Sequence, residues 1–254
     1  MMARMSVLPM HVFGSRIDLG VAAARDIAGA LRDAVAERGE ARVVFAAAPS
    51  QKETLDALVA GSDLPWDRID AFHMDEYVGL PPGAPERFAQ WLRRTLFDRV
   101  PFRSVDVIDP DDDATAEAAR YARAIAGPID VVVLGIGVNG HIAFNDPGVA
   151  DFADPYLAKV VELDEQCRMQ QVQDDCFARL ADVPATAITL TIPALMSGRR
   201  LFCVVPGAVK ARAVHATFAE PISTRWPSTI LRSHPGCTVY LDAEAAEQLE
   251  GVAR

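Results

Sequence analysis

Residues 130–148, DVVVLGIGVNGHIAFNDPG, decide the fold that we expect for this chain. The part 130–136 is apolar along almost its whole length, which is typical of a strand covered on both faces in a parallel sheet. Gly135, Gly137 and Gly140 have G-x-G-x-x-G spacing and allow a sharp turn at the strand end. Because ligands of parallel α/β sheets bind beyond the carboxyl ends of the strands, this turn is a candidate functional loop.

The same glycine spacing occurs in dinucleotide-binding loops, where the third glycine opens a helix that receives the pyrophosphate. Here Pro-Gly at 147–148 follows the third glycine within eight residues and would end such a helix. We therefore favour a catalytic loop, in which His141 projects from the sheet edge close to Asn139 and Asp146. A neighbouring carboxylate can fix one tautomer of an imidazole, which then transfers a proton near neutral pH.

The rest of the chain alternates strand-like and helix-like segments. Short β-branched runs predict strands at 42–48, 70–74, 105–109, 130–136, 200–205 and 237–242. Apolar residues at helical spacing predict helices at 17–38, 51–60, 85–99 and 113–126. This alternation indicates an α/β fold, a Rossmann-like three-layer sandwich with a mostly parallel central sheet flanked by helices. We expect a single domain over residues 1–254.

Residues 147–185 interrupt this alternation with a long polar stretch that is rich in Asp and Gln. A segment of this length between sheet elements is often a lid over an active site. A solvated helical excursion explains the composition equally well, so both interpretations stay open.

The composition excludes several classes of function. There are 35 acidic and 25 basic residues, and the resulting net charge of −10 disfavours nucleic acid and anionic membranes as partners. No apolar run approaches the roughly 18 residues that a membrane span needs. The cysteines Cys167, Cys176, Cys203 and Cys237 fit neither a zinc pattern nor a C-x-x-C pair, so we expect a reducing, cytoplasmic setting. Cys203 lies in an apolar run and is expected in the core.

A second set of polar side chains occurs in FHMDEYVGL, residues 72–80. Asp75 and Glu76 come directly after a predicted strand, at the same edge of the sheet as the His141 loop. Adjacent residues of an extended segment point in opposite directions, so one carboxylate can enter the site while the other supports the scaffold. Because both loops follow parallel strands, Asp75 and His141 can converge on one cleft.

The stretches FHMDEYVGLP and LGIGVNGHIAFNDPG, in this order and separation, resemble the glucosamine-6-phosphate deaminase (isomerase) family. Weaker similarity extends over nearly the whole chain. The resemblance implies that an amino-sugar phosphate aldose is converted to a keto-sugar phosphate and ammonia, without a cofactor or a metal. It also implies that His141 moves the proton that opens the ring and that Asp75 carries a proton from C2 to C1, with Asn139 and Asp146 in the same catalytic group.

Two members of that group depart from the family pattern. Asn139 stands where the family often has Asp, and Asp146 stands where it has Glu. The Asp side chain is one methylene shorter than Glu, so we expect a changed alignment or pKa of His141.

The phosphate loop departs further from the family. The usual Gly- and Thr-rich stretch is replaced by AAAPSQKE at 46–53, which keeps its place between a strand and a helix but lacks glycines. The side chains of Ser50, Gln51 and Lys52 can compensate as substrate ligands. Alternatively, Ser50 and Glu53 form the S-x-x-E capping box of the following helix.

Further substrate-binding residues are implied by the resemblance. Lys210 matches a phosphate-binding lysine, and a lysine suits phosphate as a point charge. The family also uses an arginine from the lid-like segment, where this chain has Gln171, and Arg168 lies one turn earlier as its replacement. We also place Glu76 among the substrate-binding residues.

Two other functions remain as alternatives. One is a 6-phosphogluconolactonase-like lactone hydrolase, although such an enzyme does not need a C2 base at Asp75. The other is a sugar-phosphate sensor on the same fold, but the chain has no basic segment for DNA binding. The expected partner is a small phosphorylated amino sugar, with no nucleic acid and no membrane, and the resemblance allows a homo-oligomer.

Overall fold

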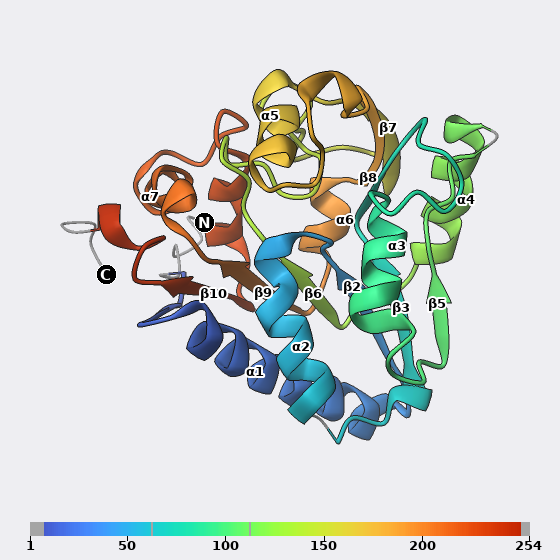
Figure 1. Ribbon diagram of the computed structural model, residues 1–254. Coiled ribbons are helices and arrows are strands. Elements are labelled where there is room, and N and C mark those ends of the chain that lie inside the picture. Colours follow the sequence, from blue (N-terminus) through green and yellow to red (C-terminus); the bar gives the residue numbers. More distant parts are fainter. Residues whose placement is uncertain (1–7, 62, 112, 250–254) are drawn as a thin grey trace.

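The computed structural model describes residues 8–61, 63–111 and 113–249 and contains a seven-stranded sheet in which every strand pairing is parallel. The strands lie in the order β1-β10-β9-β6-β2-β3-β5 (Figure 1). Their bounds are β1 (Met10–Phe13), β2 (Ala41–Phe45), β3 (Ile69–His73), β5 (Ser104–Asp106), β6 (Val131–Leu134), β9 (Arg200–Val205) and β10 (Cys237–Asp242). All six strands predicted from the sequence form, and β1 is an additional edge strand.

A second, smaller sheet was not predicted from the sequence. It is antiparallel, with the order β4-β8-β7. Its strands are β4 (Asp75–Tyr77), β7 (Ala158–Glu162) and β8 (Thr186–Leu190). The Asp-Glu pair therefore lies within a short strand of its own, and the pairing of Asp75 with Thr189 fixes its backbone.

Seven helices are described, several of them close to the predicted ranges. They are α1 (Arg16–Arg38), α2 (Lys52–Gly61), α3 (Phe88–Leu92), α4 (Ala114–Ile125), α5 (Glu165–Gln173), α6 (Ile192–Met196) and α7 (Ala211–Ala219). Helix α3 begins at Phe88, three residues after the predicted start of the helix 85–99. It continues into a π-helical turn at Arg93–Phe97. No helix in the described part of the chain is long and apolar enough to cross a membrane.

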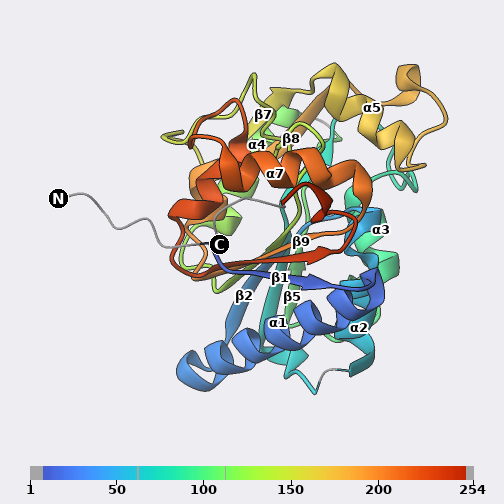
Figure 2. The same ribbon diagram turned by 90° about the vertical axis from the view of Figure 1, so that its left-hand side faces the viewer.

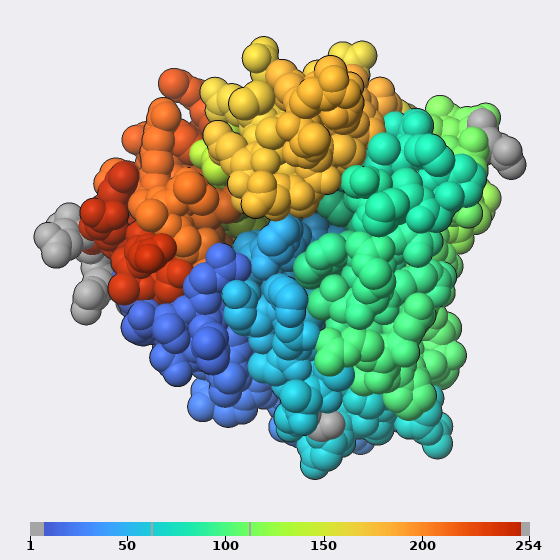
Figure 3. Space-filling model, in the orientation of Figure 1, coloured from blue at the N-terminus to red at the C-terminus, as the bar shows by residue number. Residues whose placement is uncertain are grey.

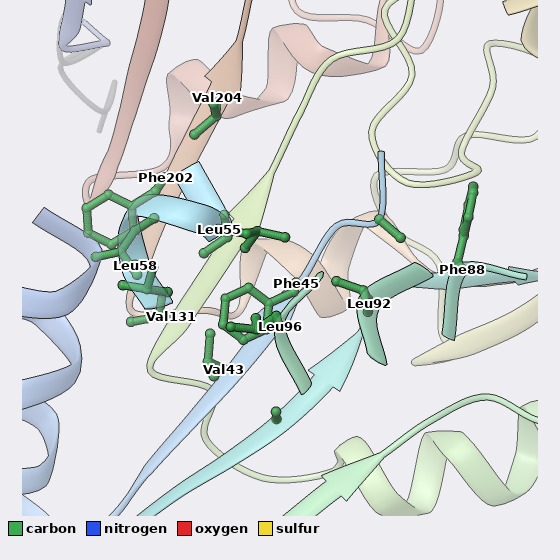
Figure 4. Close-up of a cluster of buried hydrophobic side chains, with 14 of the residues drawn as sticks. Val43, Phe45, Leu55, Leu58, Phe88, Leu92, Leu96, Val131, Phe202 and Val204 are labelled. Carbon is green, nitrogen blue, oxygen red and sulfur yellow. The ribbon is translucent and has the colours of Figure 1, made fainter. Parts of the chain in front are cut away.

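The helices cover both faces of the main sheet and form the predicted three-layer sandwich. Side chains alternate across each central strand: Val43 and Phe45 belong to the core on the side of α1, α2 and α3, whereas Val44 packs on the opposite side with α4, α6 and α7. Figure 2 shows α1 and α2 on one side of the sheet and α7 on the other. Figure 4 shows Leu55 and Leu58 of α2 packed near strand residues of the first core. The buried double-sided strands explain the continuous apolar runs in the sequence.

The carboxyl ends of the central strands lie under the second sheet and α5, which appear together at the top of Figure 1. The segment 147–185 contributes both β7 and α5 to this cover. In Figure 3 it forms a yellow cap that meets the blue and green parts of the surface along a crease. The polar segment is therefore placed over the sheet edge where ligands of α/β proteins bind.

Candidate active site

A cleft with about 530 Å³ of space, its open mouth included, lies at this edge. It is lined by the residues that follow β2, β3 and β6, by α5 and by Lys210. The polar side chains among them are Ser50, Gln51, Asp75, His141, Gln170, Gln171, Asp174 and Lys210. Asp75 and His141 thus open onto one cleft, as the parallel arrangement of their strands predicts.

The glycine loop after β6 brings His141 close to the backbone of the loop itself. The Gly137 N–H donates to the His141 carbonyl at 2.9 Å, and the Gly140 N–H donates to the Gly137 carbonyl at 2.9 Å. Gly140 has φ +82°, a conformation that favours glycine. A Cβ on Gly137 would lie only 2.2 Å from the His141 ring, so this position has no room for a side chain.

No helix follows this loop. The chain makes an isolated bridge between Ile142 and Asn145 and then turns, and the next described helix is α5. The loop therefore lacks the helix N-terminus that a dinucleotide pyrophosphate requires, which confirms the prediction from 147–148.

A buried carboxylate accompanies the imidazole. Nδ1 of His141 lies 3.0 Å from Oδ1 of Asp146. Burial acts to raise the pKa of Asp146, but contacts with His141, the Asn139 amide and the Asp164 backbone N–H outweigh it, and the pKa lies below its usual value. Asp146 is thus held as an anion beside the ring, and the shorter side chain still reaches it.

Asn139 organises the same group without entering the cleft. Its Nδ2 donates to Asp146 Oδ1 and to Asp164 Oδ2, both at 2.9 Å, and its Oδ1 accepts the His141 backbone N–H at 3.1 Å. An Asp at this position would face two carboxylates with a third, so the amide fits the surroundings that this chain provides.

Asp75 has an environment that makes it an unusual carboxylate. It is 6% exposed, and its carboxylate receives no hydrogen bond from the described residues. Burial raises the pKa of Asp75 well above its usual range, and the adjacent Glu76 raises it further. A carboxylate of raised pKa is a stronger base once it is ionised.

Glu76 points away from the cleft, so its assignment to substrate binding is wrong. Its side chain is fully buried and accepts the backbone N–H groups of Tyr77, Phe88 and Ala89 at 2.9, 3.0 and 2.9 Å. Burial raises the pKa of Glu76 to about 7, against the opposing effect of these hydrogen bonds. The residue joins β4 to the first turn of α3, which explains why α3 starts at Phe88.

Ser50, Gln51 and Lys210 also line the cleft. Lys210 is 5% exposed, and burial lowers its pKa to about 8. Among the described lining residues it is the only Lys or Arg. Gln51 donates from Nε2 to the Val204 carbonyl at 3.1 Å, while its Oε1 has no partner among the described residues.

Two expectations for the loop 46–53 were wrong, namely Lys52 as a substrate ligand and the capping box of Ser50 and Glu53. Lys52 faces outward and pairs with Asp56, so it does not line the cleft. The capping box does not form, because Ser50 lies inside a short 3-10 turn and Glu53 pairs with Arg16.

Arg168 does not reach the cleft, and the proposal that it replaces the family's arginine is wrong. Its guanidinium donates to the carbonyls of Leu180 and Val183, both at 2.9 Å, within the polar segment itself. The cleft is lined instead by Gln170, Gln171 and Asp174.

Gln170 is a residue that the sequence analysis missed. Its Oε1 accepts the Val138 N–H of the loop after β6 at 2.9 Å, and its Nε2 donates to Asp174 at 3.1 Å. The helical phase of α5 contains the relevant signal, because residues 167, 170, 171 and 174 share one face.

Comparison with known proteins gives a consistent result. A family model described as glucosamine-6-phosphate isomerases/6-phosphogluconolactonase matches residues 15–240. A glucosamine-6-phosphate deaminase of Exiguobacterium sp. is 40% identical over 189 residues, which are 72% of each chain. A protein of the same name from Listeria monocytogenes serotype 4a is 35% identical over 213 residues, 83% of this chain and 89% of that one.

Solved structures show the same likeness in three dimensions. A monomeric glucosamine-6-phosphate deaminase superposes with a TM-score of 0.86 at 28% identity, over 95% of this chain and 100% of that one. A 6-phosphogluconolactonase from Trypanosoma brucei reaches a TM-score of 0.78 at 21% identity, over 95% of this chain and 98% of that one, which is a likeness of fold alone.

Proposed function

The chain belongs to the family of glucosamine-6-phosphate isomerases and 6-phosphogluconolactonases, and we propose that it catalyses the isomerising deamination of an amino-sugar phosphate. The proposed reaction converts glucosamine 6-phosphate to fructose 6-phosphate and ammonia. The observation that carries this proposal is that a buried carboxylate, Asp75, and a carboxylate-paired imidazole, His141, line one cleft with a buried lysine.

The first step is the opening of the sugar ring. His141 donates a proton to the ring oxygen and receives one from the anomeric hydroxyl, while Asp146 stabilises the charged imidazolium. Asn139 holds both groups in place through its amide. An imidazole that alternates between donor and acceptor suits this exchange near neutral pH.

The second step moves a proton between two carbon atoms. Asp75 removes the proton from C2 and returns it to C1, which leaves an imine at C2; water then adds to this imine, ammonia leaves, and the oxygen of the water becomes the C2 carbonyl of the ketose. An ordinary carboxylate has a pKa near 4 and is a weak base for a carbon acid. Burial raises the pKa of Asp75 and so increases its basicity, and the cover formed by α5 and the second sheet limits access of water.

Substrate binding is assigned to other polar side chains of the cleft. Lys210 supplies the positive charge for the phosphate, with Ser50 and Gln51 as neutral partners. A bound phosphate dianion would favour the protonated form of Lys210 and reverse the effect of burial. Gln171 occupies the place where the family resemblance implied an arginine, so the cleft holds less positive charge than that resemblance implies.

The setting of this reaction follows from its substrate. We propose a cytoplasmic enzyme, because phosphorylated sugars are formed inside cells and the cysteines in the described part of the chain are unpaired. The partner is the small-molecule substrate, with neither nucleic acid nor membrane required, and self-association is compatible with the family.

Replacement of Asp75 by Asn tests the proposal directly. In deuterated water the wild-type enzyme should release ammonia from glucosamine 6-phosphate and place deuterium in the product. Asp75→Asn should lose turnover and C2 exchange while it still binds the sugar phosphate, whereas Asp67→Asn, an exposed control, should behave as wild type. Exchange that persists in Asp75→Asn would remove Asp75 from the role of base, and hydrolysis of 6-phosphogluconolactone instead of deamination would reject the function.

A further inference from the structure

Three side chains that could bind a metal ion lie between the loop after β6 and helix α5. Nδ1 of His141, a carboxylate oxygen of Asp146 and Sγ of Cys167 all lie within 4.8 Å of one another. The first two residues belong to the loop after β6, and Cys167 belongs to α5. All three are buried, with exposures of 9%, 1% and 0%.

These atoms match the preferences of one class of metal ion. Tetrahedral zinc sites use imidazole nitrogen, thiolate sulfur and carboxylate oxygen at about 2.0–2.3 Å from the metal. Ligand atoms of such a site lie about 3.5 Å apart, so movements of roughly 1 Å would bring the three donors to bonding distance. Mg²⁺ and Ca²⁺ prefer all-oxygen sites, and a thiol with an imidazole does not suit them.

The imidazole nitrogen in this cluster already faces one of the other two donors. Nδ1 of His141 is buried and lies 3.0 Å from Oδ1 of Asp146. A metal ion between the two side chains would bind the neutral ring through the Nδ1 lone pair, with the single ring proton on Nε2.

The charges around the cluster also favour a cation. The Cys167 thiol lies in the field of the carboxylates of Asp146 and Asp164, and Lys210 is the cation that also acts on it. A divalent ion would be stabilised by these carboxylates and would displace the thiol proton.

We propose that a divalent ion of the zinc class binds His141 Nδ1, Asp146 and Cys167, and that its binding reversibly inhibits the enzyme. Binding releases the thiol proton to solvent, and the imidazole keeps its single proton on Nε2. The ring can then donate but cannot accept, whereas ring opening needs both. The ion would also tie α5 to the catalytic loop. Binding stands independently of the proposed function, and only the inhibition rests on it.

Cobalt titration tests the binding. Co²⁺ replaces zinc in such sites, and a thiolate ligand gives a near-ultraviolet charge-transfer band. The wild-type protein should show this band with saturation at one equivalent of Co²⁺, and Cys167→Ser should lose it. Cys176→Ser is the matched control, because Cys176 belongs to the same polar segment but lies outside the cluster, and it should retain the band. A band that survives in Cys167→Ser, or is absent from wild type, overturns the proposal.

A second variant covers the case in which Cys167→Ser does not fold. Asp146→Asn preserves the size of the side chain and should weaken Co²⁺ binding by at least about tenfold. Unchanged binding in Asp146→Asn would also overturn the site.

Enzyme assays then separate binding from function. Zn²⁺ should inhibit wild type and Cys176→Ser, but not Cys167→Ser, and Mg²⁺ at the same concentration should have no effect. Equal inhibition of Cys167→Ser rejects the proposed inhibition. A cysteine-dependent cobalt band in a protein that does not deaminate the sugar phosphate would support the metal site and reject the proposed function.

Discussion

Replacement of Gly137 by Ala should disable the catalytic imidazole without removing any reacting group. A Cβ at Gly137 would lie 2.2 Å from both Cε1 and Nε2 of His141 and 2.4 Å from Cδ2. Normal contact between such atoms needs about 3.5 Å, so the ring must move by more than roughly 1 Å. A misplacement of about 1 Å can reduce the rate by about 10²-fold. We expect a loss of this size in kcat for glucosamine 6-phosphate.

The same substitution has a predictable effect on stability. The ring is buried next to Asp146 and has little space for movement, and overpacking of this kind lowers the free energy of unfolding by about 1–3 kcal/mol. Thermal unfolding should therefore show a modest decrease in Tm while the protein remains folded. Gly148→Ala is the matched control in the same loop, because a Cβ there has nothing within 4 Å.

Two assays separate ring opening from the later steps. Fructose 6-phosphate formation reports overall turnover, and an open-chain substrate analogue bypasses the step assigned to His141. Gly137→Ala should slow the cyclic substrate far more than the analogue, because Asp75 lies on another strand and is not displaced. Turnover of Gly137→Ala within threefold of wild type, or equal slowing of both substrates, would refute the assigned position and role of the ring.

The buried ionisable groups give two further predictions. Lys210 has a pKa lowered to about 8, so it loses its charge as the pH rises through that value, and KM for the sugar phosphate should increase above pH 8. This rise should be absent from Lys210→Met, whose KM is already high, and a KM of wild type that stays constant to pH 9.5 would contradict it. Glu76→Gln turns an amide N–H toward a backbone donor and should lower the free energy of unfolding by about 1–3 kcal/mol. Urea unfolding measures this change, the exposed Glu220→Gln serves as the control, and equal stability of the two variants would contradict the role of Glu76.

The main sheet could be predicted because its signal lies within each segment. Strands such as 131–134 are apolar on both faces, and this pattern needs no knowledge of partners. The second sheet could not be predicted in this way. β4 has three residues, and its pairing with β8 joins positions more than 100 residues apart, so only the folded chain identifies it.

In the candidate site too, contacts within one loop could be predicted from the sequence, whereas contacts between different elements could not. The contact of His141 with Asp146 spans five residues and is readable from the loop sequence. Glu76 and Arg168 were misassigned because their partners come from other elements: backbone N–H groups of α3 for the first, and carbonyls after α5 for the second. Adjacent residues of a strand do point in opposite directions, as expected for Asp75 and Glu76. The sequence does not show, however, which groups of other elements contact the Glu76 side chain.

Burial acts in opposite directions on the pKa values of the two charged groups that the proposed reaction needs. It raises the pKa of Asp75 and so favours the neutral acid, and it lowers the pKa of Lys210 and so favours the neutral amine. The proposed chemistry requires the ionised form of both. For Lys210 the phosphate of the substrate restores the charge, because a dianion next to the amine stabilises the ammonium form.

For Asp75 the raised pKa makes the ionised carboxylate a stronger base, and this gain is largest where the pKa lies near the working pH. A carboxylate with an ordinary pKa would be fully ionised at neutral pH and yet too weak to remove a proton from carbon at a useful rate. The like charge of Glu76 and the closed strand environment of β4 raise the basicity of Asp75 at the atom that must meet C2. In the proposed mechanism the misassigned glutamate therefore contributes from outside the cleft, through its position next to Asp75 rather than through contact with the sugar.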